Sequence, residues 1–84
     1  MDRVAELKDL QTRIDQLNGN GRRMWATAFS YEKVLDWDTG KGRTVRDRLE
    51  TEAVAQCEDL FPADANPAIQ ISPGYANYLV TVRW

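Results

Sequence analysis

The chain has 84 residues, of which 43% are hydrophobic and 29% are charged, and its 11 basic and 13 acidic residues give a formal net charge of −2. This length suits a single domain over residues 1–84, and the hydrophobic content excludes a disordered chain. The sequence lacks the excess of Lys and Arg that binding to nucleic-acid phosphates requires, so we expect no direct contact with DNA or RNA.

The sequence also bears on the compartment. No apolar run reaches the length of a membrane span, and the first residues, MDRVAELKDLQ, lack the apolar stretch of a signal peptide. The single cysteine, Cys57, cannot form a disulfide within the chain, which favours a reducing compartment. We therefore predict a cytoplasmic protein that has no membrane partner.

The first predicted element is an amphipathic helix that begins after the N-cap residue Asp2 and ends near Asn18. Its apolar residues recur at steps of three and four, and charged residues fill the opposite face. The run is too short for a coiled coil to be preferred, so we expect the apolar stripe to pack on the chain's own core. The stripe consists of Val4, Leu7, Leu10, Ile14 and Leu17.

Residues 22–35, RRMWATAFSYEKVL, are rich in aromatic and β-branched side chains and predict a strand. Trp25, Thr27, Phe29 and Tyr31 would share one side of it, and the other side is also largely uncharged. A strand of this kind is either covered on both sides or presents one side to a partner. We interpret the aromatic side as a contact surface.

A second helix is predicted after the loop DWDTGKGRT. Thr44 and Asp47 have the spacing of a capping box, and an apolar stripe then extends to about Leu60, before Phe61 and Pro62 end the helix. Its members are Val45, Leu49, Ala53, Cys57 and Leu60.

The C-terminal part predicts a β-hairpin, because AIQIS and ANYLVTVRW both alternate in hydrophobicity and Ser72-Pro73-Gly74-Tyr75 is typical of a turn. The element order is therefore α-β-α-β-β, and the simplest arrangement places the last strand in the centre, antiparallel to its two neighbours. We predict an α+β fold, a two-layer sandwich with two helices on one face of a three-stranded antiparallel sheet.

Few residues are suited to catalysis or metal binding. The chain has no His, and one Cys cannot supply a thiolate cluster. Glu32, Asp36 and Asp38 lie close in sequence, but the ligand pattern of a calcium loop is absent, so we interpret them as solvated acids. An enzyme would have to rely on carboxylates and Arg alone. We predict no enzymatic activity, no catalytic residues, no metal site and no cofactor.

The string Gly40-Lys41-Gly42-Arg43-Thr44 is the strongest candidate for a small-ligand site, because glycines expose backbone N–H groups, the bases add positive charge, and a helix begins next. It does not match a P-loop, since the Lys precedes the second Gly and the spacing is too short. A basic loop without a ligand is the plainer interpretation. The alternative function is an oligomeric binder of a small phosphorylated or nucleotide ligand at Lys41, Gly42, Arg43 and Thr44.

Three tryptophans in so small a chain exceed what its core readily hides, and Trp is enriched at binding hot spots. Trp37 lies between two aspartates that must stay hydrated, so we expect it to be at least partly exposed. The partner-binding residues that we predict are Trp25, Phe29, Tyr31, Asp36, Trp37 and Asp38.

Together these features predict a small binding protein that acts through protein–protein contacts. Small size, mild acidity and aromatic residues are typical of accessory proteins of phages and mobile elements, such as anti-CRISPR and other anti-defence inhibitors; this is a likeness of type, not of sequence. A two-sided apolar strand also leads us to expect a homodimer or a tight protein partner.

Overall fold

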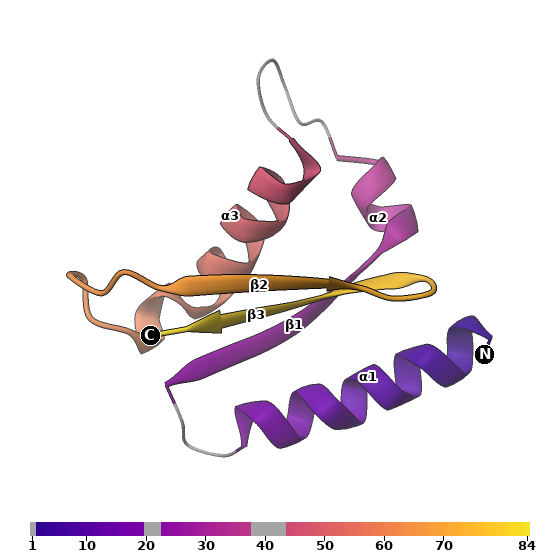
Figure 1. Ribbon diagram of the computed structural model, residues 1–84, viewed down its shortest axis with the longest axis horizontal. Helices are drawn as coiled ribbons and strands as arrows, with labels where there is room; N and C mark the ends of the chain where they lie inside the picture. The colour runs from indigo at the N-terminus through magenta and orange to yellow at the C-terminus, as the bar shows by residue number, and fades with distance from the viewer. Residues whose placement is uncertain (1, 20–22, 38–43) are drawn as a thin grey trace.

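The computed structural model describes residues 2–19, 23–37 and 44–84. Helices and strands follow one another along the chain and are labelled in Figure 1. They are α1 (Arg3–Asn18), β1 (Met24–Ser30), α2 (Tyr31–Leu35), α3 (Val45–Cys57), the 3-10 helix η1 (Glu58–Leu60), β2 (Ala68–Pro73) and β3 (Asn77–Arg83). No helix in these ranges is long and apolar enough to cross a membrane.

The three strands form an antiparallel sheet in the order β1-β3-β2. Trp25 lies opposite Val82, and Ile69 lies opposite the same valine on the other side. The predicted α+β class, the antiparallel sheet and the central position of the last strand are therefore confirmed.

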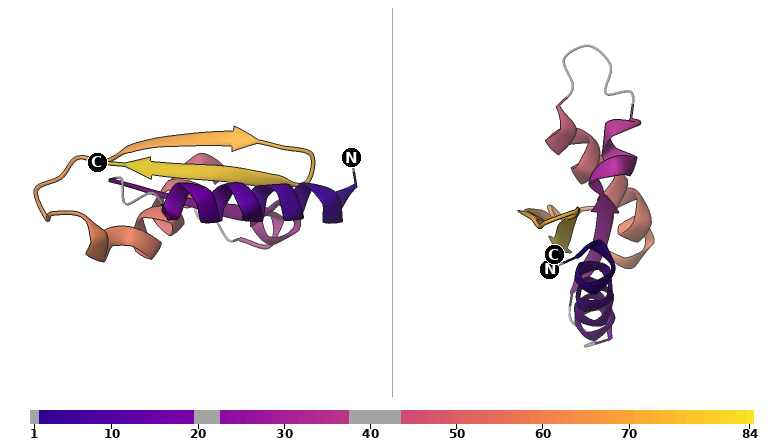
Figure 2. Two further views of the ribbon diagram at one scale, coloured as in Figure 1. Left: turned by 90° about the horizontal axis from the view of Figure 1, so that it is seen from below. Right: turned by 90° about the vertical axis from the view of Figure 1, so that its right-hand side faces the viewer.

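The two long helices lie on opposite faces of the sheet, which corrects the prediction that both cover one face (Figures 1 and 2). One core cluster joins Phe29 and Val80 to the α3 residues Leu49 and Ala53. A second cluster joins Ala26 and Leu79 to Ile14 of α1. Because consecutive residues of a strand point to opposite faces, the two clusters lie on the two sides of the sheet. The architecture is thus α1, sheet, α3.

Local signals in the sequence account for both long helices. The Asp2 side chain accepts a hydrogen bond from Ala5 N at 2.7 Å and so caps α1. The predicted capping box of α3 is present, since the Thr44 hydroxyl accepts from Asp47 N and the Asp47 carboxylate accepts from Thr44 N.

The first strand is shorter than predicted, because β1 ends at Ser30 and Tyr31 begins the short helix α2. The Ser30 hydroxyl accepts a hydrogen bond from Lys33 N at 3.1 Å and acts as the N-cap. Tyr31 is consequently a helical residue and does not extend the aromatic side of the strand.

The outer edge of β1 is bound by the last residue of α1. Ala26 N donates to the side-chain oxygen of Asn18 at 2.7 Å, and the Asn18 amide nitrogen donates to Ala26 O at 3.0 Å. Ala26 is only 1% exposed. One amide side chain therefore satisfies both backbone groups that a neighbouring strand would otherwise bind.

Candidate functional site

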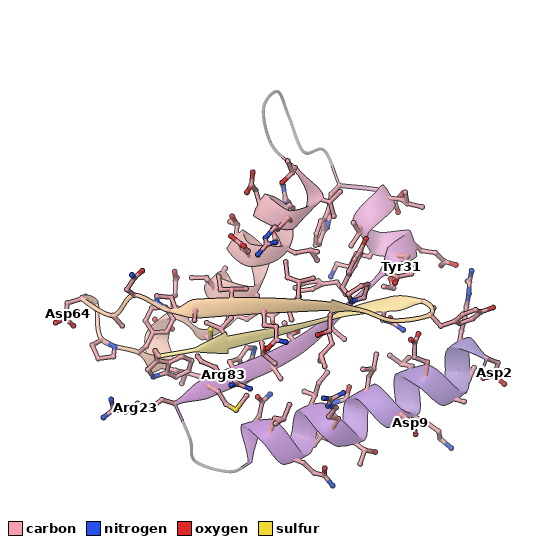
Figure 3. The ribbon with its side chains drawn as sticks, in the orientation of Figure 1. Asp2, Asp9, Arg23, Tyr31, Asp64 and Arg83 are labelled. Carbon is pink, nitrogen blue, oxygen red and sulfur yellow. The ribbon has the colours of Figure 1, made fainter. Side chains whose placement is uncertain are left out.

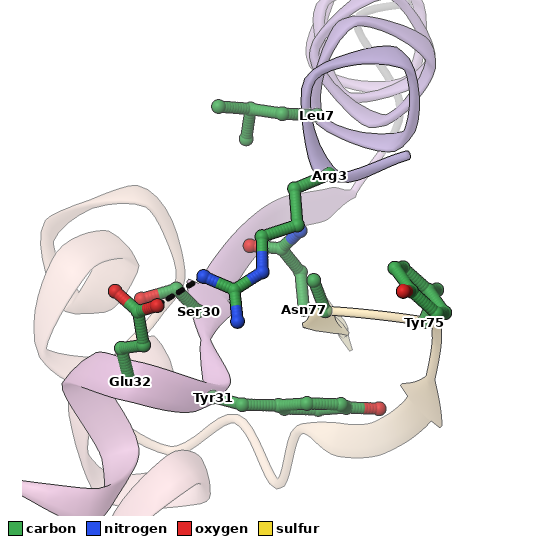
Figure 4. Close-up of a pocket in the computed structure, with 8 residues that line it drawn as sticks. Arg3, Leu7, Ser30, Tyr31, Glu32, Tyr75 and Asn77 are labelled. Atoms are coloured by element: carbon green, nitrogen blue, oxygen red, sulfur yellow. Dashed lines mark hydrogen bonds and ion pairs between the residues drawn. The ribbon is translucent and has the colours of Figure 1, made fainter. Parts of the chain in front are cut away.

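A cleft of about 390 Å³ opens where three parts of the chain meet, namely the start of α1, the junction of β1 with α2, and the β2–β3 turn (Figure 4). Figure 3 shows Asp2 and Tyr31 toward this end of the molecule, and Arg23 and Asp64 at the other. The residues that line the cleft are Arg3, Leu7, Ser30, Tyr31, Glu32, Tyr75, Ala76 and Asn77.

Glu6 holds the β2–β3 turn against α1. One of its carboxylate oxygens accepts from Tyr75 N, and the other accepts from Ala76 N at 2.6 Å and from the Asn77 side-chain amide at 3.1 Å. Burial by itself would raise the pKa of Glu6, but the hydrogen bonds from Ala76, Tyr75 and Asn77 outweigh it and lower the pKa below its usual value. Glu6 is therefore a buried carboxylate that stays charged and fixes one wall of the cleft.

Gly74 permits this close approach. A side-chain carbon at position 74 would collide with the Glu6 carboxylate and lie 3.1 Å from Asn77 O. The backbone of the turn could not then come near enough for Glu6 to accept its N–H groups. Glycine at this position is thus required by the contact between α1 and the turn.

Tyr31 fixes the turn from the other side. Its hydroxyl donates to Gly74 O, and its ring packs edge-to-face on Tyr78 with 4.7 Å between the centroids. Burial, with smaller contributions from Tyr78 and Glu6, raises the pKa of the Tyr31 phenol. The phenol therefore keeps its proton and remains a donor at neutral pH.

Four further polar side chains of the cleft, those of Arg3, Glu32, Ser30 and Asn77, also have partners within the chain. Arg3 pairs with Glu32 across the opening, as the dashed line in Figure 4 marks. The Ser30 hydroxyl caps α2, and the Asn77 amide is bound by Glu6. The interaction that the cleft offers to another molecule is thus mainly apolar.

Large apolar side chains are exposed at this end of the molecule. Leu7 is 52% exposed and Tyr75 is 68% exposed, and both line the cleft. Val4, one helical turn before Leu7, is 70% exposed. The predicted apolar stripe of α1 therefore packs on the sheet only in its second half, around Leu10, Ile14 and Leu17.

The contact surface predicted on β1 lies mostly inside the fold. Phe29 is 3% exposed and belongs to the core cluster beneath α3. Trp25 is half-buried against this cluster, and its indole N–H donates to the Gln56 side chain at 3.2 Å. Tyr31 lines the cleft, Asp36 is exposed, and Asp38 lies outside the described residues. The strand is thus covered on both sides rather than presented to a partner.

Trp37 is half-buried, which agrees with the expectation of partial exposure, but it packs on the core. Its ring meets Phe29 edge-to-face at 5.4 Å, and the Arg48 guanidinium lies 5.4 Å from its centroid. Trp37, two residues after the end of α2, therefore contacts both β1 and α3.

Of the predicted anion-binding string, the structure describes only Thr44, and Lys41, Gly42 and Arg43 lie outside the described residues. The side chain and backbone N–H of Thr44 both serve the capping box. Cys57 is buried within the core, where burial raises the pKa of its thiol. No group of three or more His, Cys, Asp or Glu in the described ranges is placed to hold a metal ion.

Glu6, Leu7 and Tyr75 are not among the site residues that the sequence predicts. Glu6 resembles the other acids of α1, and its partners lie about 70 positions away in the sequence. Leu7 belongs to a helical stripe that was expected to be buried throughout. No local signal distinguishes Glu6 or Leu7 from the neighbouring residues of α1.

Comparison with known proteins adds no assignment: no family model, no curated protein and no solved structure matches this chain.

Proposed function

We propose that this protein acts by binding another protein, without catalysing a reaction, and that the contact is made at the cleft between α1 and the β2–β3 turn. The observation that carries the proposal is the exposure of Leu7 and Tyr75 on either side of one cleft whose walls are held in place from within. Exposed apolar side chains beside a concave surface are typical of protein contact sites.

Tyr75 is the central residue of this proposal. Its ring is exposed at the tip of the turn, while its backbone is fixed by Glu6, so binding orders little of the chain. A tyrosine presented in this way combines apolar area with a hydroxyl that can hydrogen-bond to a partner. Leu7 supplies an adjacent apolar contact across the cleft.

An inhibitor of the phage-accessory type, which the sequence analysis predicts, acts by occluding a surface of its target and is the class that we propose. A site of this kind needs shape and apolar area rather than reactive groups. The paired state of Glu32 and Tyr31 supports binding over acid–base chemistry, since each already serves another group of the chain.

The test is affinity capture from cells that carry the gene, with Leu7→Ser and Tyr75→Ser compared against the wild-type chain. Leu60→Ser is the matched control, because Leu60 is similarly exposed, at 56%, but lies in η1. A partner that is retained by Leu60→Ser and lost by the two cleft variants is the expected result. With a purified partner, Tyr75→Ala should weaken binding by about 2 kcal/mol, the scale of a hot spot. Equal capture by all variants would exclude the cleft.

A further inference from the structure

Strand β2 forms an uncovered edge of the sheet. Figure 2 shows it as the outermost strand, with the helices gathered over the rest of the sheet. α1 packs mainly on β1, and α3 packs mainly on β3 and β1. Charged side chains are one common means of protecting such an edge from pairing. The segment Ala68–Pro73 carries none.

The backbone of β2 presents a short set of free hydrogen-bonding groups. Gly74 N donates to Asn77 O at 2.8 Å and closes the hairpin, so alternate residues from Gly74 back along β2 face β3. Ser72, Gln70 and Ala68 are these residues. Ile69 and Ile71 therefore direct their N–H and C=O groups outward, and no described residue binds them.

We propose that β2 pairs with β2 of a second copy of this chain, antiparallel and centred on Gln70, so that the two sheets join into one. In this arrangement Ile69 of one copy lies opposite Ile71 of the other. The two-fold axis makes both Ile69–Ile71 pairs equivalent, and each pair exchanges two backbone hydrogen bonds. The surface is the same on both copies, as a two-fold dimer requires.

Two prolines restrict the pairing to this register. Pro67 and Pro73 flank the free groups, and neither has an N–H to donate. In the register centred on Gln70, they lie opposite each other beyond the bonded pairs. A shift of two residues would place a proline opposite Ile69 or Ile71 and lose donors. The prolines thus set both the length and the register of the ladder.

The side chains of β2 are self-complementary in the same register. Ile69 and Ile71 are half-buried against the core cluster beneath α3, and pairing would continue this apolar row across the two copies. Gln70 is exposed on the opposite face and would lie directly across from the Gln70 of the second copy. Two amides can donate to and accept from each other, so the uncharged strand meets its own copy without repulsion.

The experiment places opposite or like charges at the two-fold axis. Gln70→Lys and Gln70→Glu should each raise the dimer dissociation constant roughly tenfold or more, because like charges then face each other on adjacent strands. A mixture of the two variants should form a heterodimer. Sedimentation equilibrium measures the constants, with one variant carrying a fluorescent label in the mixture.

The matched controls are Gln16→Lys and Gln16→Glu, which place the same charges at an exposed position of α1 and should dimerise like the wild-type chain. Thermal unfolding checks that every variant is folded. The proposal is overturned by a wild-type chain that is monomeric up to high micromolar concentration, by Gln70 variants that dimerise as the wild type does, or by a mixture that stays monomeric. The cleft takes no part in this contact, so the test is independent of the proposed function.

Discussion

The two edges of the sheet differ in how their outward-facing backbone groups are bound. At β1, the Asn18 side chain binds both outward groups of Ala26, and α1 covers the strand. At β2, the outward-facing N–H and C=O groups of Ile69 and Ile71 have no partner in the described ranges, and the strand carries no charged side chain. The edge of β1 is therefore closed at Ala26 by a contact within the chain, whereas the free groups of Ile69 and Ile71 on β2 are bounded only by the two prolines.

This difference separates stability from association. A polar group that is buried and already paired contributes to folding, because removing its partner leaves it unsatisfied. A polar group at an open edge is bound by water in the single chain and gains a protein partner only on association. Substitutions at the β1 edge should therefore act on unfolding, and those at the β2 edge should act on assembly.

The largest effect on stability is expected from Asn18→Ala. This substitution leaves the N–H and C=O of Ala26 without partners in a buried position, which should lower the free energy of unfolding by about 2 to 3 kcal/mol. Gln16→Ala removes a similar side chain from the exposed face of the same helix and serves as control. Urea unfolding followed by circular dichroism measures both. A loss below about 0.5 kcal/mol for Asn18→Ala, the range of ordinary surface changes, would show that water replaces the amide and that the edge is not sealed.

Much of the fold is predictable because its signals are local. Asp2 caps α1, and the Thr44–Asp47 box starts α3, each through side chains within three residues of the groups that they bind. The alternation in β2 and β3, with the short turn between them, determines the hairpin. The order of the elements then places β3 in the centre.

The placement of the helices on opposite faces follows from the uncharged character of both sides of β1. β1 is uncharged on both sides, so each side needs a cover, and two helices are available. The small Ala26 and Ala28 admit α1 on one face, whereas the larger Phe29 and Trp25 receive α3 on the other. β1 ends earlier than predicted because Ser30 is an N-cap within an otherwise strand-like run.

The cleft could not be predicted from the sequence, because it depends on contacts between distant segments. Nothing near Glu6 distinguishes it from Asp9 or Asp15, and its role follows from the position of the β2–β3 turn. The same holds for Tyr31, whose partner Gly74 is 43 residues away. Long-range contacts of this kind become visible only when the sheet has brought the segments together.

An intermediate effect, confined to acid pH, is expected from Glu6, which holds the turn at one end of the open strand. Its pKa is lower in the folded chain than in the unfolded chain, so its contribution to stability is present above the unfolded value of about 4.3 and is lost as the pH falls through the folded value. The free energy of unfolding of the wild-type chain should therefore decrease below about pH 4.3, and less steeply in Glu6→Gln. Urea unfolding between neutral pH and about pH 3 measures both slopes.

Glu58→Gln is the control for Glu6, since it removes a carboxylate from the exposed helix η1 and reports any general effect of net charge. Identical slopes for Glu6→Gln and the wild-type chain would mean that the carboxylate does not hold the turn in solution. The wall of the cleft would then lack its main support.

The smallest effect on unfolding is expected from Gln70→Ala, which removes from the open edge the same kind of side chain that Asn18→Ala removes from the closed one. Gln70 is exposed, and its own backbone groups face β3, so truncation leaves no buried group unsatisfied. At concentrations where the chain is monomeric, the free energy of unfolding should change by less than about 0.5 kcal/mol. Dimer dissociation should nevertheless be easier, because the amide pair at the two-fold axis is lost. Unfolding and sedimentation measured on the same samples give both quantities. If monomeric Gln70→Ala lost as much stability as Asn18→Ala, Gln70 would be shown to stabilise the folded monomer. The distinction between a closed edge and an open edge would then fail.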